Sequence, residues 1–516
     1  MLFVLNLELL PGEGTNALTS DAQDASGRLY QLKVEHVSRV PGQEWMHAVV
    51  LRLDDGMTDA LGDVLVRVSL HGMSSNRVRV AVGRAGGGPP DDPGSTPTAA
   101  PPTPPNATPT PLPAYGPNEA SEADTTRFLE QASWGPTPAE IARVRALGLR
   151  AYLNEQFNAT PSGYPLMPLY PQDNAQGCPS AVLNDPAYHR NVCIRQNYSM
   201  YPLQVQFFKN ALYGQDQLRQ RVAFALHQIL VVSGRDPINQ ASWLGPYVQI
   251  LERHAFGNYR QLLREVTLNP AMGLYLDTLG NTRTNPNENF AREILQLFSV
   301  GVDELNPDGT PRLDAQGNRV PTYTQETVNN FTRVFTGWTL AAPRTATIDG
   351  VSFSVLNFRD PMVAREQNHD TGAKTLLSYP NAPSFNLPPG QTASADLDAA
   401  LNNIFNHPNV GPFVGRQLIQ HLVTGNPSPA YVGRVAAVFN NNCAGLYPES
   451  CTGERGDLKA TVRAVLLDPE ARGDVKTDPG YGKLREPAQY VNNVLRALNV
   501  KSFDKTSTSD GVLGIR

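Results

Sequence analysis

The sequence predicts a mainly α-helical domain with a small hairpin insertion, preceded by a Pro/Thr-rich linker and a small N-terminal all-β sandwich. Three observations carry this prediction. Residues 1–86 contain short alternating apolar runs, which are typical of strands. Residues 87–117 are rich in proline and threonine, which favours a linker. Residues 118–516 repeat apolar side chains every three or four positions, the period of a helix.

The N-terminal region contains four strand-like runs, at residues 30–34, 47–53, 64–70 and 77–82. In the last run, Val78, Val80 and Val82 fall on one face, because strand side chains alternate between two faces. Short strands separated by turns at this spacing favour an immunoglobulin-like sandwich. No residue in this region indicates chemistry, so we expect an adhesive or spacer module.

The linker contains two proline-rich runs, at residues 99–105 and 108–111. Such a composition favours an extended polyproline II conformation and cannot bury a core. We therefore expect a semi-rigid stalk between the two folded parts.

The third part is predicted to be one large helical domain without an internal repeat. Helices are expected at residues 124–131, 138–147, 217–231, 243–256, 259–268, 286–300, 325–335, 412–423, 431–440, 458–467 and 487–498. The helix at 217–231 has an apolar face formed by Leu218, Val222, Leu226 and Ile229. Turn residues between 306 and 323 indicate the hairpin insertion, and residues 351–358 resemble a strand.

Bulk properties exclude two classes of protein. The net charge of −5 and the pI near 6.0 argue against a nucleic-acid-binding protein, which needs a basic surface. No apolar run approaches the roughly 20 residues that a membrane-spanning helix needs. The sequence identifies no cofactor and no metal site.

The four cysteines fall into two local pairs, Cys178 with Cys193 and Cys443 with Cys451. Neither pair has the CxxC spacing of a zinc or redox motif, and short loops closed by disulfides suit an oxidising compartment. Four unrelated buried thiols are the alternative. The segment 2–10 after Met1 lacks the features of a signal peptide. We therefore expect a fragment of an exported, extracytoplasmic protein whose signal peptide was lost by truncation.

The densest polar motif of the chain is residues 285–293, NPNENFARE. Its structural interpretation is a capped helix, with Asn285 as the N-cap and Pro286 at the first helical position. Glu288 at the third position would complete a capping box, and it can pair with Arg292 four residues later.

The functional interpretation uses the residues that capping leaves over. Asn287, Asn289 and Glu293 are needed neither for the cap nor for the core, and amides beside carboxylates suit a polar ligand. Glu288 in a partly buried pocket would have a raised pKa and act as a general acid or base. Arg292 would then bind an anionic group of the substrate.

A second candidate group lies in the irregular region after residue 341. His369 and Asp370 are predicted to assist catalysis, and Lys374 to hold an anion. A hydrogen bond that stabilises the loop is the alternative for the His-Asp pair. Trp338 would line a substrate pocket or close the core. The chain contains no HExxH, GxSxG, P-loop, dinucleotide-binding or EF-hand motif.

Several ordered motifs resemble the bacterial family called domain of unknown function 1800, over about residues 121–510. They are residues 127–136, 269–272, 275–277, 287–293, 335–338, 369–370, 422–429, 463–472 and 485–487. The resemblance implies an exported protein, often encoded beside a partner with an alkaline-phosphatase-like fold, the family of unknown function 1501. It implies no catalytic residues. The chain is also expected to stop before the final segment of the family, and so to be truncated at its C-terminus.

Two hypotheses about function remain open, and the sequence leaves unsettled whether the chain is an enzyme. The first is a hydrolase or lyase acting on an extracellular polymer or envelope component, such as a polysaccharide. The second is a non-catalytic, surface-associated binding or assembly protein. The enzyme hypothesis is favoured by the concentration of polar residues around Glu288, which should then line a cleft together with His369. The binding hypothesis predicts that Glu288 and Arg292 are paired, buried and remote from any cleft.

Overall fold

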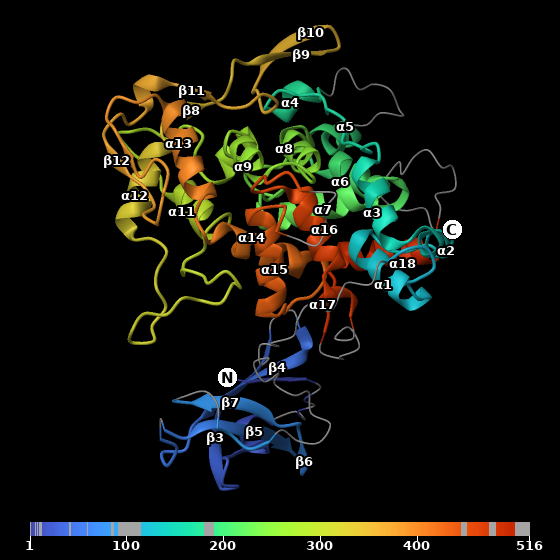
Figure 1. Cartoon of the computed structure of the whole chain (residues 1–516), viewed down its shortest axis with the longest axis vertical. Coiled ribbons are helices and arrows are strands. Elements are labelled where there is room, and N and C mark those ends of the chain that lie inside the picture. Colours follow the sequence, from blue (N-terminus) through green and yellow to red (C-terminus); the bar gives the residue numbers. More distant parts are fainter. Residues whose placement is uncertain are drawn as a thin grey trace. The chain divides into compact units, whose positions relative to one another are not determined.

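The computed structural model describes the chain except for residues 1, 6, 8, 10–12, 41–42, 59, 84–86, 91–114, 180–189, 445–450, 474–480 and 501–516. Figure 1 shows the arrangement of its elements. The chain divides into two compact units, residues 1–106 and 107–516. The division falls inside the predicted linker, most of which lies outside the described residues.

The N-terminal unit is an antiparallel sheet. Its strands are β1 (Leu2–Leu5), β2 (Leu18–Gln23), β3 (Leu29–Val40), β4 (Gln43–Arg52), β5 (Gly62–Leu70), β6 (Met73–Ser74) and β7 (Val78–Val82). The strand order is β1-β4-β3-β2-β5-β6, and β7 pairs with residues Gly62 to Val66 of β5, on the same edge as β6. Every predicted strand is present. β2 escaped prediction because its buried positions include Ser20, and a polar side chain weakens the apolar signal.

The second unit is mainly helical. Its helices are α1 (Glu122–Ala132), α2 (Pro138–Leu147), α3 (Leu149–Asn158), α4 (Asn174–Gly177), α5 (Arg190–Asn197), α6 (Tyr201–Tyr213), α7 (Gln217–Ile229), α8 (Ala241–Arg253), α9 (Tyr259–Thr267), α10 (Pro270–Tyr275), α11 (Asn289–Gln296), α12 (Gln325–Val334), α13 (Ala393–Phe405), α14 (Val410–Leu422), α15 (Pro429–Asn440), α16 (Leu458–Leu467), α17 (Pro469–Arg472) and α18 (Pro487–Ala497). Each predicted helix coincides with one of these.

The apolar faces of these helices meet in one continuous core. The predicted face of α7 is buried as expected, with Leu218, Val222 and Leu226 at 0% exposure. Burial of such side chains contributes about 1.5–3 kcal/mol each relative to exposure. This packing is what holds α11, α12 and α13 side by side, the three helices that carry the polar motifs.

Short strands connect the helices between residues 303 and 387. Residues 303–321 fold back through isolated antiparallel bridges, which form the predicted hairpin insertion. A regular hairpin follows, with β9 (Arg344–Ile348) paired to β10 (Val351–Val355), the start of the predicted strand-like segment. The small pairs β8 (Trp338–Thr339) with β11 (Val363–Ala364) and β12 (Lys374–Thr375) with β13 (Asn386–Leu387) complete this region.

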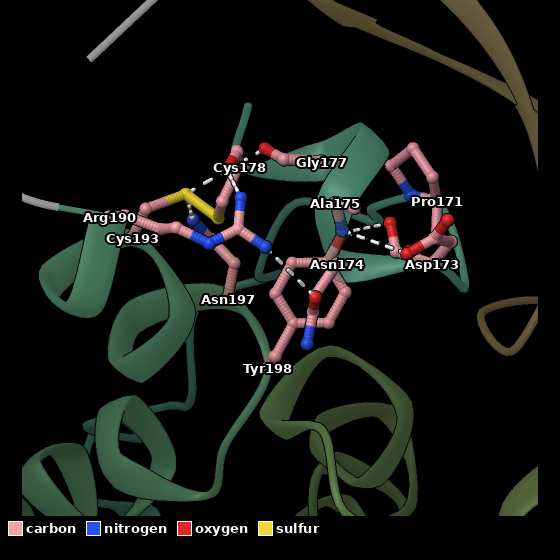
Figure 2. The surroundings of a disulfide bond; sticks show 10 residues. All are labelled: Pro171, Asp173, Asn174, Ala175, Gly177, Cys178, Arg190, Cys193, Asn197 and Tyr198. Atoms are coloured by element: carbon pink, nitrogen blue, oxygen red, sulfur yellow. Dashed lines mark hydrogen bonds between the residues drawn. A yellow bond between two sulfur atoms is a disulfide. The ribbon is translucent and has the colours of Figure 1, made fainter. Parts of the chain in front are cut away.

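Both predicted disulfides are present, Cys178 with Cys193 and Cys443 with Cys451. The first joins the residue after α4 to the middle of α5, and Figure 2 shows its polar surroundings. Within the described residues, no helix is long and apolar enough to cross a bilayer.

Candidate functional site

The helix of the NPNENFARE motif begins later than predicted. α11 starts at Asn289, with Glu288 in the N-cap position and without a side-chain cap, so the predicted capping box of Asn285 and Glu288 is wrong. The reason is a side-chain contact from the preceding loop. The buried side chain of Asn281 accepts a hydrogen bond from the Asn287 backbone nitrogen (2.9 Å), which holds residue 287 outside the helix.

Glu288 and Arg292 form an ion pair on the surface of α11. Arg292 Nη2 lies 2.8 Å from Glu288 Oε1, and Gln325 Nε2 donates to Glu288 Oε2 at 2.9 Å. The side chains of Arg292 and Glu288 are 34% and 44% exposed, so the pair is not buried as the binding hypothesis predicts. The hydrogen bonds from Arg292 and Gln325 lower the pKa of Glu288 below its usual value. A raised pKa was expected here, so the carboxylate has the opposite tendency from that of a general acid.

The side-chain amides of Asn287 and Asn289 stabilise the loop that precedes α11. Asn289 Nδ2 donates to Asp277 Oδ2 at 2.6 Å, and Asn287 Nδ2 lies 3.3 Å from the same oxygen. Asn287 Oδ1 also accepts from the backbone nitrogen of Asn289 (2.9 Å). Asp277 has a φ of 60°, a conformation that short polar side chains tolerate. These contacts close the loop between α10 and α11.

Glu293 has a different environment from Glu288. Its side chain is partly buried, and this burial raises its pKa. Glu293 Oε2 is buried without a hydrogen-bond partner among the described residues, and the same holds for the hydroxyl of Tyr323. Burial also raises the pKa of Tyr323, which the charge of Glu293 reinforces.

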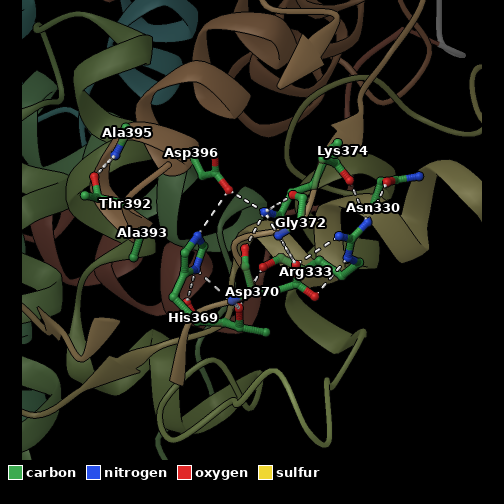
Figure 3. A network of polar contacts seen from close by, with 12 residues as sticks. Asn330, Arg333, His369, Asp370, Gly372, Lys374, Thr392, Ala393, Ala395 and Asp396 are labelled. Atoms are coloured by element: carbon green, nitrogen blue, oxygen red, sulfur yellow. Dashed lines mark hydrogen bonds and ion pairs between the residues drawn. The ribbon is translucent and has the colours of Figure 1, made fainter. Parts of the chain in front are cut away.

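His369 is fully buried. Its Nε2 lies 3.1 Å from Asp396 Oδ2, and its Nδ1 lies 3.0 Å from the carbonyl oxygen of Thr336 (Figure 3). Gly337, with φ of 89°, packs directly on the His369 backbone, so a side chain at residue 337 would meet it at about 3 Å. The imidazole therefore bonds to the protein at both nitrogens and does not face solvent.

Lys374 and Asp370 belong to the same network. Lys374 Nζ lies 2.6 Å from Asp396 Oδ2 and also donates to the carbonyl oxygens of Asp370 and Gly372. Both oxygens of Asp370 accept from Arg333, at 3.0 and 2.9 Å, and the Arg333 hydrogen bonds lower the pKa of Asp370. The loop at residues 369–374 is thus fastened to α12 and α13 (Figure 3).

Asp396 was not predicted, although it is the centre of this network. It lies in the first turn of α13 and is fully buried, with Oδ1 lacking a hydrogen-bond partner in the described structure. One signal was available: a carboxylate stands on the apolar face of the helix, between Ala393 and Ala400. An acidic residue in such a stripe needs a buried cation, because an unpaired buried charge is costly.

Trp338 lies in the core, 3% exposed, in the short strand β8. Its ring is therefore placed to close the core rather than to face a ligand. The indole nitrogen finds no hydrogen-bond partner among the residues described.

The two polar groups do not meet. Gln325, which contacts Glu288, and Arg333, which contacts Asp370, stand eight residues apart on α12, or about 12 Å along the helix axis. Two surface cavities, of about 330 and 560 Å³, lie elsewhere and are lined by none of the predicted catalytic or binding residues. No group of three His, Cys, Asp or Glu residues suited to a metal ion occurs in the described ranges.

Comparison with known proteins identifies a family. A family model described as a protein of unknown function (DUF1800) matches residues 127–512, well over half of the chain. No curated protein and no solved structure matches the chain.

Proposed function

Since the chain belongs to the DUF1800 family of proteins of unknown function, we propose from its geometry that it is a non-catalytic binding or assembly protein outside the cytoplasm. One observation carries this proposal. Two of the acidic groups of its motifs pair with arginines of the chain, and no motif residue lines either of the two cavities described above. Glu288 pairs with Arg292, and Asp370 pairs with Arg333. An enzyme would instead present an acid and a base to a substrate-sized cleft.

The buried network supports the same proposal. His369, Lys374 and Asp396 are at most 3% exposed, and the described contacts account for both histidine nitrogens. Such a group cannot reach a polymer without local unfolding. Its contacts join the loop 369–374 to α12 and α13, which is a structural role.

The place and partners of the protein are part of the proposal. Two disulfides suit an oxidising compartment, and we propose a periplasmic, secreted or cell-surface location. The N-terminal antiparallel sheet would be an immunoglobulin-like sandwich that a Pro-rich stalk separates from the helical unit. An extracellular polysaccharide and a protein with an alkaline-phosphatase-like fold are the proposed partners.

The test compares binding with turnover in the whole chain. Purified protein is incubated with isolated envelope polysaccharide and with phosphoester substrates, and bound protein and released products are both measured. Wild type and E288Q are expected to bind alike and to release no product. The glutamine keeps an oxygen for Arg292, so folding should be retained. Product release by the wild type would overturn the proposal, and its loss in E288Q at unchanged Tm would assign it to Glu288.

A hydrolase or lyase is the second candidate, and one observation favours it. Glu293 has a pKa raised by burial and an unpartnered oxygen, as a general acid requires. If Glu293 is the general acid of such an enzyme, E293Q would abolish product release while E288Q would not. Product release that is equal in the wild type and E293Q would exclude Glu293 as the acid.

A further inference from the structure

The larger of the two cavities described above, about 560 Å³, has the size of a ligand site. It lies where the start of α8 meets α4 and the end of α5. Its lining residues are Gln172, Asn174, Ile194, Tyr198, Pro237, Asn239, Gln240, Trp243, Leu274, Leu279, Leu340, Leu356 and Phe358. None of the polar motifs described above contributes to it, so the cavity is a separate site.

The chemistry of the lining is uncharged throughout. No Asp, Glu, Lys, Arg or His side chain lines the cavity. A charged ligand would lose water there without gaining an opposite charge, which is unfavourable. The cavity therefore selects a neutral ligand.

One wall of the cavity is apolar and rigid. The rings of Trp243 and Phe358 stack with centroids 4.1 Å apart and an interplanar angle of 4°. Both side chains are buried, and Leu274, Leu340 and Leu356 extend the apolar surface around them. A flat ligand face made of C–H groups can pack against this apolar wall.

The other wall presents carboxamides. Gln172 and Asn239 are exposed, and their side chains make no hydrogen bond within the described residues. Gln240 is only 4% exposed, and its Oε1 is buried without a partner in the described part of the chain. A carboxamide both donates and accepts, as a hydroxyl group does. The Gln240 oxygen can therefore accept a hydrogen bond from a ligand hydroxyl group.

The disulfide between Cys178 and Cys193 lies beside the part of the lining that is formed by Gln172, Asn174, Ile194 and Tyr198. The Tyr198 hydroxyl donates to the carbonyl oxygen of Pro171 at 2.8 Å, and Arg190 Nη2 donates to Asn174 Oδ1 at 3.3 Å (Figure 2). The bridge joins the two short helices that carry these contacts. A wall fixed before binding reduces the entropy lost when a ligand is ordered.

We propose that this cavity binds a neutral sugar unit of a glycan. The hydroxyl groups of the sugar would bond to the amides of Gln172, Asn239 and Gln240. Its C–H face would pack on the wall of Trp243 and Phe358. A sugar ring combines hydroxyl groups at its rim with an apolar face, and it carries no charge. This inference rests on the proposed binding function and names the ligand class and the site.

The test measures the binding of neutral oligosaccharides to the full chain. Tetrasaccharides of glucose, galactose and mannose are titrated, with calorimetry and tryptophan fluorescence as readouts. The double variant Q172A/N239A changes two exposed side chains, so its Tm should match the wild type. Loss of a hydrogen bond weakens binding by about three- to tenfold, so the pair is expected to weaken it by about tenfold or more. The Q240L variant tests the buried amide separately.

A matched control is Q316A, which truncates an exposed glutamine in the loop at residues 314–318, outside the cavity lining. It should bind like the wild type. Sugar binding that is unchanged in Q172A/N239A and Q240L would overturn this site and leave the binding function standing. The absence of binding to every sugar, or binding of uncharged glycine-serine peptides instead, would overturn the ligand class. Cleavage of a bound sugar would overturn the non-catalytic function and leave the site standing.

Discussion

Lys374 and Asp396 form a buried ion pair, with Nζ 2.6 Å from Oδ2 and both side chains at most 1% exposed. The pair joins a loop to a helix that begins 19 residues later in the chain. His369 binds the same carboxylate oxygen from the other side. One aspartate thus fastens the segment that carries the His-Asp motif.

We expect K374M to destabilise the helical unit by about 3–5 kcal/mol, because it leaves a charged Asp396 buried without its cation. Urea-induced unfolding measures the change. The double variant K374M/D396N should be less destabilised than the sum of the two single variants, since the residues are in contact. E288Q serves as the control: Glu288 belongs to a 44% exposed pair, and its loss should cost less than about 1 kcal/mol. A K374M effect as small as that of E288Q would contradict the structural role.

Asn281 is expected to control the start of α11. Its amide accepts from the Asn287 nitrogen at 2.9 Å and donates toward the carbonyl oxygens of Asn287 and Phe335, both at 3.3 Å. In N281A these backbone groups, of which the Phe335 carbonyl is in a buried contact, lose their partner, at a cost of about 1–3 kcal/mol. Hydrogen exchange should become faster at Asn287 and Asn289 while the core of α7 stays protected. Unchanged exchange at both amides would show that the loop is held without Asn281.

The two disulfides should differ in what they affect. Opening either one should lower stability by about 2–3 kcal/mol, through the greater freedom of the unfolded chain. Only C178S/C193S should also weaken sugar binding, because only that bridge adjoins the amide wall of the cavity. C443S/C451S is therefore the matched control. Equal sugar affinity in the two variants, at equal Tm, would show that the Cys178–Cys193 disulfide does not support sugar binding.

A loss of stability in mild acid is expected from His407. Burial, with the nearby charge of Arg455, lowers the pKa of His407 to about 4, below the usual value of 6.5. The unfolded chain therefore binds a proton between pH 6.5 and 4 that the folded chain does not. Stability is complete above pH 6.5 and falls toward pH 4, on the order of 1 kcal/mol per pH unit.

The variant H407N tests this expectation. The imidazole Nδ1 accepts from the Asn409 nitrogen at 3.1 Å, and an asparagine oxygen can take its place. Unfolding free energies at pH 7.0, 5.5 and 4.5 should decline less steeply in H407N than in the wild type. His421, whose pKa is also lowered to about 4 by burial, should account for part of the remaining slope. Parallel slopes in the two proteins would exclude His407 as the source.

The sequence by itself determined many of the elements, the disulfides and the family, but it missed β2 and helices such as α3, α6 and α13. The apolar face of α7 and the alternation in β5 are local patterns, and local periodicity determines which side of an element is buried. The pairing of Cys178 with Cys193 was predicted because the loop between these two cysteines is short. The signature motifs identified a family that the match over residues 127–512 shows.

Only the tertiary structure determined which partners the polar residues contact. Glu288 is bonded to Gln325 because α11 and α12 pack together, and α11 starts late because Asn281 holds residue 287. Asp396 meets His369 across 27 positions of chain. The uncharged cavity likewise gathers residues from 172 to 358. A carboxylate or an amide has no partner until packing brings one within about 3 Å, and no periodic pattern records that distance.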